Sequence, residues 1–288
     1  VSQCSLGQWI PSGFGCRPAP CAQPEHTECE ARRTIPHGKT CRCILGWSST
    51  CHYGVWDPPF SPCAGLVTGS DDKTARLWDL ASGELIRTFS GHTGGVRAVA
   101  VTAAGQLVTG SRDETARLWD LASGEPIRTF SGRTGSVYAV AVTAAGQLVT
   151  GSRDKTARLW DLASGEPIRT FSGHTGSVYA VAVTAAGQLV TGSRDSTARL
   201  WDLASGEPIR TFSGHTGDVY AVAVTAAGQL VTGSGAALSF WSDNTARLWN
   251  LASGELIRTF SGHTGGVRAV AVTAAGQLVT GSSDKTAR

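Results

Sequence analysis

Histidine, threonine and aspartate recur in this sequence at spacings that could support hydrolytic chemistry. His92 is followed by Thr109 and then by Asp113. A hydroxyl, an imidazole and a carboxylate in proximity supply the nucleophile, the base and the orienting group of a hydrolase. The same set returns at the same spacing after His174, and again after His215 with a longer gap before Asp243. An active site needs one exposed constellation with an oxyanion pocket, whereas this set occurs once per repeat, so we interpret it as architecture.

The repeat itself is 41 residues long and is shown by Gly132–Ser172, GRTGSVYAVAVTAAGQLVTGSRDKTARLWDLASGEPIRTFS. Copies or partial copies fill the chain from Leu66 to Arg288. A period of this size, with Gly-His near one end and Trp-Asp near the other, is typical of a propeller array. Each copy predicts four antiparallel strands, here Val137–Val142, Gln147–Gly151, Thr156–Trp160 and Ile168–Phe171. We expect the first strand, apolar on both faces, to be the most buried and the fourth, which follows a proline, to be the sheet edge.

The repeat resembles the WD40 repeat over residues 65–288. This resemblance implies an all-β WD40 β-propeller array of about five to six blades that forms an incomplete ring. The expected blades lie near 66–90, 91–131, 132–172, 173–213, 214–261 and 262–288, the last being partial. The first blade lacks an inner strand. In an alternative arrangement the strand at 267–272 completes the blade of Trp78, which gives five blades and a spare strand.

The resemblance also assigns a role to the recurring polar residues, because in the family a His, a Thr, an Asp and a Trp form a hydrogen-bonded tetrad within each blade. The implied structural tetrads are His92, Thr109, Asp113 and Trp119; His174, Thr191, Asp195 and Trp201; and His215, Thr232, Asp243 and Trp249. One copy differs, because Arg133 stands at the histidine position. We expect this change to break the network with Asp154, Thr150 and Trp160. The blade would then be looser, or Arg133 would pair with Asp154 at the surface.

All eight cysteines lie between Cys4 and Cys63. Cysteine and histidine side chains can bind zinc, and a C-x-C pair lies near His37 and His52. The C-x2-C pairs of zinc knuckles are missing, so we expect disulfides, with no metal and no cofactor. A disulfide framework would suit a small domain with little core.

The pattern C-x2-G-x-W-x6-C occurs twice, from Cys4 to Cys16 and from Cys51 to Cys63. It resembles the sushi, or complement-control, module, with residues 1–16 as the tail of one module and 17–64 as a second. The resemblance implies the disulfides Cys21–Cys51 and Cys43–Cys63, and leaves Cys29–Cys41 and Cys4–Cys16 as further pairs. The alternative is an EGF-like module, which the stretch from Cys41 to Trp47 resembles.

Differences between the WD40-like copies gather at the end of each blade that carries the His loop and the Asp turn. In the family this end is the usual partner-binding face. The candidate contact residues are Arg97, Arg112, Tyr138, Arg153, Tyr179, Arg194, Tyr220, Phe240, Trp241 and Arg268. Arg and Tyr would suit an acidic or phosphorylated segment. Alternatively, these side chains are merely solvated. The insertion at 235–241 is likewise either an interaction loop or a remnant of duplication.

The composition narrows the classes of function. A net charge of +3 on 288 residues does not favour binding to nucleic acid, and no apolar run is long enough to span a membrane. We therefore expect a non-catalytic scaffold for protein or peptide partners, or alternatively the recognition arm of a larger enzyme or signalling protein. The chain begins at Val1 and contains no Met, so a fragment or a processed chain is expected. The cysteines favour an extracellular or lumenal location, whereas the WD40-like array favours the cytoplasm.

Overall fold

The computed structural model describes residues 40–42, 48–52, 55–57, 65–235 and 243–288. Every regular element in these ranges is a β-strand. The described part of the chain therefore contains no helix that could cross a membrane. Near the N-terminus the strands β1 (Thr40–Arg42), β2 (Ser48–His52) and β3 (Val55–Asp57) form a three-stranded antiparallel sheet.

Four complete blades follow, each a four-stranded antiparallel sheet in sequence order. The first contains β7 (Val96–Val101), β8 (Gln106–Ser111), β9 (Ala116–Asp120) and β10 (Pro126–Phe130). The second contains β11 (Val137–Val142), β12 (Gln147–Ser152), β13 (Ala157–Asp161) and β14 (Pro167–Phe171). The third contains β15 (Val178–Val183), β16 (Gln188–Ser193), β17 (Ala198–Asp202) and β18 (Pro208–Phe212). The fourth contains β19 (Asp218–Val224), β20 (Gln229–Gly235), β21 (Ala246–Asn250) and β22 (Leu256–Phe260).

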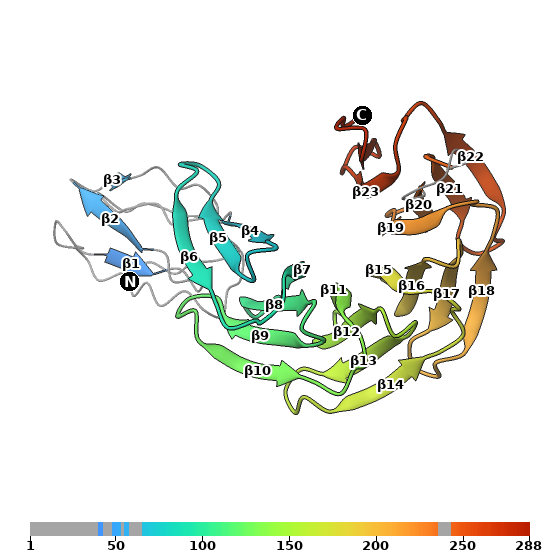
Figure 1. Cartoon of the computed structure of the whole chain (residues 1–288). Coiled ribbons are helices and arrows are strands. Elements are labelled where there is room, and N and C mark those ends of the chain that lie inside the picture. Colours follow the sequence, from blue (N-terminus) through green and yellow to red (C-terminus); the bar gives the residue numbers. More distant parts are fainter. Residues whose placement is uncertain (1–39, 43–47, 53–54, 58–64, 236–242) are drawn as a thin grey trace, which may run out of the picture.

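A smaller sheet lies at each end of this array. The first contains β4 (Gly65–Gly69), β5 (Ala75–Asp79) and β6 (Leu85–Phe89), and the last contains β23 (Val267–Val272) and β24 (Leu278–Ser282). The sheets follow one another around an arc whose two ends lie apart (Figure 1). Among the described strands β23 pairs only with β24, so the alternative in which it completes the blade of Trp78 is wrong.

The sequence placed the strands of the β11–β14 blade to within about one residue. The prediction that the innermost strand is the most buried was wrong. Leu148–Ser152 in β12 are all buried, whereas β11 is buried only at Val137 and Ala139. The reason is that the inner strands line a central cavity, where Val140 lies beside its equivalents in the neighbouring blades.

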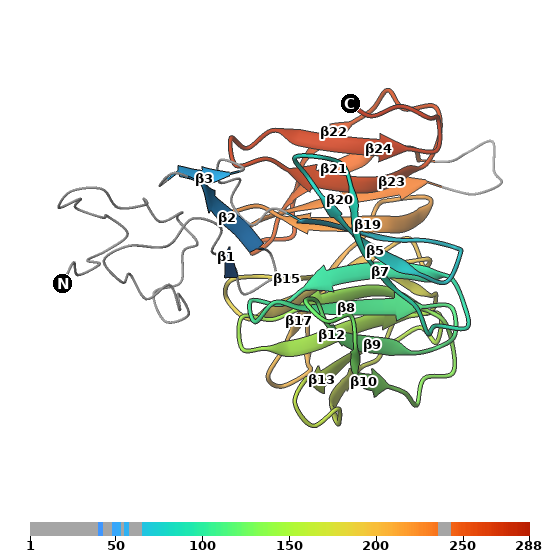
Figure 2. The same cartoon turned by 90° about the vertical axis from the view of Figure 1, so that its left-hand side faces the viewer.

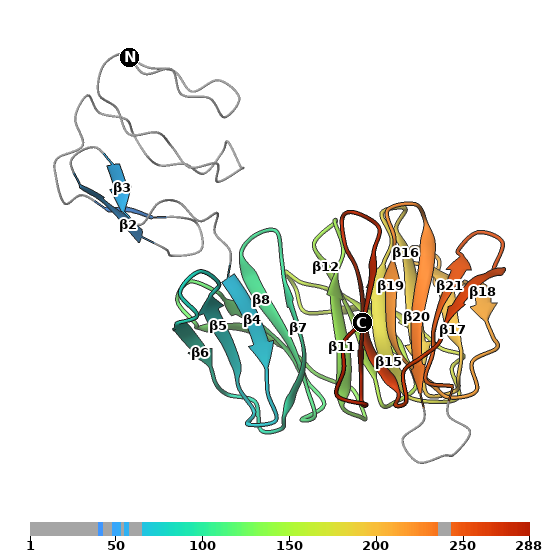
Figure 3. The ribbon, with the colours of Figure 1, turned by 90° about the horizontal axis from the view of Figure 1, so that it is seen from above.

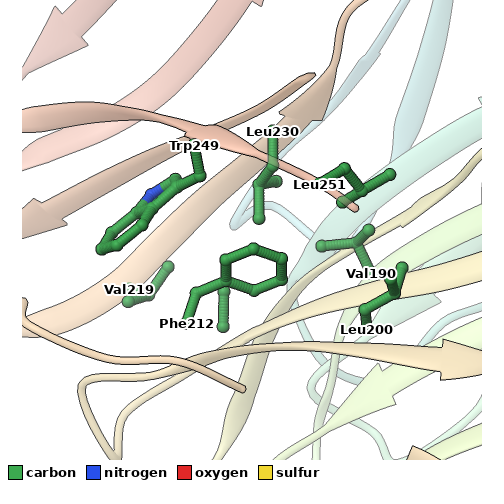
Figure 4. Packing of buried hydrophobic residues seen from close by; sticks show 8 residues of the cluster. Val190, Leu200, Phe212, Val219, Leu230, Trp249 and Leu251 are labelled. Atoms are coloured by element: carbon green, nitrogen blue, oxygen red, sulfur yellow. The ribbon is translucent and has the colours of Figure 1, made fainter. Parts of the chain in front are cut away.

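The hydrophobic core lies between blades rather than within them. Phe212 and Leu200 of the β15–β18 blade pack against Leu230 and Trp249 of the β19–β22 blade, and each of these side chains is at most 3% exposed (Figure 4). Equivalent clusters lie between each earlier pair of blades. Burial of one large apolar side chain contributes about 1.5–3 kcal/mol, so neighbouring blades stabilise each other strongly.

Arginines on the fourth strands add a polar link between blades. Arg87 Nη1 donates to the carbonyl oxygen of Ser123 in the next blade at 2.6 Å, and Arg128 Nη1 donates in the same way to Ser164 at 2.6 Å. Arg169 and Arg210 repeat the contact. The receiving turn ends in glycine at positive φ, as at Gly165, where a Cβ would come within 2.7 Å of Arg128 Cδ. Seen from above, the sheets follow one another from β4–β6 to β19–β22 (Figure 3), and in the view from the left-hand side of Figure 1 they overlap (Figure 2).

Candidate functional site

The recurring polar residues meet inside each blade. In the β7–β10 blade, His92 Nδ1 lies 2.7 Å from Asp113 Oδ2, and His92 Nε2 lies 2.7 Å from Thr109 Oγ1. Trp119 Nε1 donates to the same threonine oxygen at 2.9 Å. The chain of contacts joins the loop before β7, the end of β8 and the turn before β9. It therefore fixes the loop end of the blade against its interior.

The same geometry appears in the later blades. The matching contacts join His174 to Asp195 and Thr191, with Trp201 bonded to that threonine, and His215 to Asp243 and Thr232, with Trp249 bonded likewise. A fourth histidine set, which the sequence interpretation left out, links His263 to Asp284 and Thr280, each at 2.8 Å. The Gly-His and Ser-x-Asp signals at this copy could have revealed it.

The sequence interpretation also missed a second threonine in each turn. Thr115 Oγ1 donates to Asp113 Oδ1 at 2.7 Å, and its backbone N–H donates to the same oxygen at 3.1 Å. Equivalent contacts are made by Thr156, Thr197, Thr245 and Thr286. The signal for them is the D-x-T-A-R word in every copy, since an aspartate two residues before a threonine closes a tight turn.

These contacts determine the charge state of the network. Burial opposes ionisation of Asp113, but hydrogen bonds from Thr115 and His92 outweigh it and lower the pKa of the carboxyl to about 2. Burial also lowers the pKa of His92 below its usual 6.5, against the attraction of Asp113. The Thr109 hydroxyl cannot act as a nucleophile for an external substrate, because this residue is 0% exposed and its oxygen is hydrogen-bonded to His92 and Trp119.

The β11–β14 blade retains its network despite the arginine. Arg133 Nη1 donates to Asp154 Oδ1 at 3.0 Å and to Thr156 Oγ1 at 3.1 Å. Arg133 Nη2 donates to the carbonyl and hydroxyl oxygens of Thr150 at 2.8 and 2.5 Å, and Trp160 Nε1 still reaches that hydroxyl at 2.8 Å.

Two sequence-based expectations for this blade were therefore wrong, namely that the network breaks and that the pair lies at the surface. The Arg133 side chain is 1% exposed, and its pairing with Asp154 is internal. The reason is that the guanidinium carries several donors in a plane and can span the same acceptors as an imidazole. Burial lowers the pKa of Arg133 to about 10, so it stays charged at neutral pH.

The tyrosines predicted for the partner face form a continuous row with Arg268. The ring centroids of Tyr138 and Tyr179 are 5.2 Å apart, and those of Tyr179 and Tyr220 are 5.1 Å apart and stacked. Arg268 Cζ lies 3.6 Å from the centroid of the Tyr220 ring. We call these four residues the tyrosine row. It joins the inner strands of three blades to β23, and its three tyrosines line the central cavity.

Apart from Arg268, the predicted arginines of this face fall into two groups. Arg97 Nη2 lies 2.9 Å from Asp71 Oδ1, and Arg112 Nη1 lies 3.5 Å from the same oxygen, so the charges of these two are partly neutralised. Arg153 and Arg194 form no ion pair with a described carboxylate. Both line one pocket of about 370 Å³ at the junction of the β11–β14 and β15–β18 blades.

We call this feature the cationic pocket. It is lined by Arg153 and Lys155 from one turn, by Thr175, Gly176 and Ser177 from the loop before β15, and by Arg194 and Asp195 from the next turn. Asp195 is occupied by the network of its own blade. Burial opposes its ionisation, but hydrogen bonds from His174 and Thr197 outweigh it and lower the pKa of this carboxyl below its usual range.

Other predicted features lie outside the described residues. Phe240 and Trp241 belong to the insertion, and the sushi-like segments with their disulfides lie where no side chain is described. Within the described ranges, no group of three or more His, Cys, Asp or Glu side chains is arranged to hold a metal ion.

Comparison with known families decides what the repeats are. The family described as "WD domain, G-beta repeat" matches six segments: 30–79, 83–120, 124–161, 165–202, 206–250 and 254–288. The chain belongs to the WD40 repeat family. The first WD40 match begins at residue 30, so it overlaps the segment expected to be a sushi-like module.

The curated relatives share short stretches of this WD40 chain. WD repeat-containing protein 86 of Homo sapiens is 39% identical over 70 residues, which cover 22% of this chain and 18% of that protein. WD repeat-containing protein pop1 of Schizosaccharomyces pombe is 46% identical over 41 residues, 14% of this chain and 5% of that one. The matched stretches thus span less than a fifth of these relatives.

A solved structure supports the WD40 fold over a larger part of the chain. The crystal structure of the WD40 beta propeller domain of Doa1 is similar with a TM-score of 0.69 and 28% sequence identity, over 78% of this chain and 73% of that one. WD40 propellers typically serve as non-catalytic scaffolds for protein interactions, which agrees with the buried threonine hydroxyls.

Proposed function

We propose that this WD40 array is a non-catalytic protein-interaction platform whose loop face binds acidic or phosphorylated segments. The observation that carries the proposal is the cationic pocket, where Arg153, Lys155 and Arg194 lie at one junction and none of them forms an ion pair with a described carboxylate, while Asp195 in the lining is held by its own network. Guanidinium groups bind carboxylates and phosphates through paired charge-assisted hydrogen bonds, which are about twice as strong as neutral ones.

The tyrosine row gives the same face a second kind of contact. Tyr138, Tyr179 and Tyr220 are half-buried and held by mutual stacking, so they lose little conformational freedom when a partner binds. Tyrosine and arginine supply many of the residues that dominate binding energy at protein interfaces. An acidic segment bound at the pocket would have this rigid aromatic surface next to it on the same loop face.

The proposal can be tested with arrays of acidic, phosphorylated and basic peptides and the full chain. We expect binding to acidic or phosphorylated peptides that weakens as salt rises, because the charges lie at the surface. The variant R153E/R194E should lose this binding, whereas R258E, on the exposed edge strand β22, should retain it. Equal binding to basic peptides, or an unchanged R153E/R194E variant, would refute the proposal. A nuclease-treated sample should bind identically, which separates protein partners from nucleic acid.

A further inference from the structure

The repeats allow the cationic pocket to be compared with its equivalents in the same chain. One junction earlier, the corresponding positions are Arg112 and Glu114 on one side and Thr134, Ser136 and Arg153 on the other. One junction later, they include Arg194 and Ser196 facing Thr216 and Asp218. Beside the network aspartate that every junction shares, as Asp195 at the cationic pocket, each neighbouring junction therefore has one further acidic residue, Glu114 or Asp218. At the cationic pocket the matching positions are Lys155 and Ser177.

The turn that supplies Arg153 and Lys155 also has an altered interior. Between them in sequence lies Asp154, whose carboxylate is 6% exposed and is bound by the permanently charged guanidinium of Arg133. In the other networks the equivalent aspartate carboxylate faces an imidazole, which is positively charged only when it is protonated. The Arg133 substitution therefore balances the charge of Asp154 from inside the blade and leaves Arg153 and Lys155 free to attract an external anion.

We propose that the cationic pocket binds the phosphate group of one phosphoserine or phosphothreonine in a partner protein, and that Arg133 strengthens this binding from beneath. The inference rests on the proposed function, since it names the ligand of that same face. A phosphomonoester carries a charge of about −1.5 to −2 at pH 7 and three acceptor oxygens. Two guanidinium groups and one ammonium group, offset in part by the Asp195 carboxylate of the lining, supply enough positive charge for it, and the Thr175 and Ser177 hydroxyls add neutral donors.

The neighbouring junctions favour an isolated phosphate over a polyanion as the ligand of this pocket. A nucleic acid backbone or an anionic membrane presents a series of phosphates, and several junctions of the face would have to accept them. Glu114 and Asp218 place a negative charge on each side of the cationic pocket. The arrangement therefore favours an isolated phosphate on a polypeptide.

The test uses the full chain and three probes: inorganic phosphate, N-acetyl-O-phosphoserine N-methylamide and N-acetylglutamate N-methylamide. Binding is followed by NMR titration at pH 7.5 and at pH 5. We expect the phosphoserine probe to bind at least about tenfold more tightly than the glutamate probe. Its affinity should fall at pH 5, because the second phosphate ionisation has a pKa of about 6.

The repeats also supply variants that should fold. K155E places glutamate in the turn position that Glu114 occupies, with φ 69° against 70°, and S177D copies Asp218. Each should weaken phosphoserine binding by about tenfold or more, because a carboxylate then faces the phosphate. R133H, which restores the histidine of the other blades, should weaken it by about two- to fivefold through loss of a buried charge. K285E makes the same charge change in the equivalent turn of the last repeat and should change binding by less than about twofold.

The outcomes separate the two proposals. If the glutamate probe binds as tightly as the phosphoserine probe, the phosphate inference is overturned while the acidic-segment platform stands. Equal loss in K155E and K285E would mean that net charge, not this pocket, governs binding, and would also overturn the inference. If neither these probes nor any acidic or phosphorylated peptide binds, the proposed function fails together with it.

Discussion

Replacing Arg133 with leucine should destabilise the β11–β14 blade strongly, whereas replacing it with histidine should not. Leucine removes every hydrogen bond that Arg133 donates to Asp154, Thr156 and Thr150. The Asp154 carboxylate then loses its buried cationic partner, although its side chain is only 6% exposed. Histidine occupies the same position in the other networks and reaches the equivalent acceptors at 2.7 Å.

The expected loss of stability in R133L follows from the carboxylate that stays buried without its partner. Removing one partner of a buried ion pair costs about 3–5 kcal/mol, because the remaining charge loses both its solvation and its partner. Arg158 Nη2 lies 3.7 Å from Asp154 Oδ2 and compensates part of the loss, so we expect R133L to cost about 3 kcal/mol. R133H should stay within about 1 kcal/mol of the parent protein, because an imidazole restores one bond to the carboxylate and one to the hydroxyl.

The assay is urea unfolding followed by tryptophan fluorescence, combined with amide hydrogen exchange in β11–β14. In the parent protein, exchange in this blade should match that of β15–β18, since both networks are complete. A loss below about 1 kcal/mol in R133L would refute the account of a buried ion pair. An R133H variant as unstable as R133L would refute the equivalence of the two networks.

Four further predictions address single contacts. Burial lowers the pKa of His92, so this residue takes up a proton on unfolding once the pH falls below 6.5, and the free energy of unfolding should decrease there. The variant H92R should reduce this pH dependence, as measured by urea unfolding at a series of pH values. R128M, which removes the 2.6 Å bond to Ser164, should lower stability by about 1 kcal/mol, with R258M as the control. E114N should raise stability by about 0.5 kcal/mol, because Glu114 has φ 70° and asparagine tolerates that conformation better. Mass spectrometry of the non-reduced protein should find the predicted Cys21–Cys51 and Cys43–Cys63 bonds, and free thiols would contradict them.

Much of the array could be predicted because each copy repeats the same local signals. Alternating apolar residues, the Ala-Ala-Gly turn and the D-x-T-A-R turn fix strand order and boundaries in Gln147–Asp161 to within a residue. The burial of individual strands could not be predicted in the same way. The apolar strand Val137–Val142 looks like a buried core strand, and only the curvature of the whole array shows that it lines a central cavity.

The candidate site was only partly predictable for a related reason. The sequence singled out Tyr138 and Arg153 as positions where copies differ. It could not show that Arg97 and Arg112 share Asp71 while Arg153 forms no ion pair with a described carboxylate. The sequence also predicted that Arg133 breaks its network. Whether a planar guanidinium reaches Asp154 and Thr150 depends on their positions in space, which the sequence does not show. Pairing across blades depends on geometry that no single repeat contains.

The packing of apolar clusters between blades gives the array the behaviour of a one-dimensional chain of coupled units. A blade in the middle is held by two neighbours, whereas the sheets β4–β6 and β23–β24 each contact one described neighbour through such packing. Phe260 is accordingly more exposed than Phe212, its equivalent one blade earlier. Unfolding should therefore begin at the two ends and move inward, and each repeat added to an end should increase the stability of the blade it covers. The cationic pocket lies between two interior blades, in the stretch of the array that would be the last to lose its order.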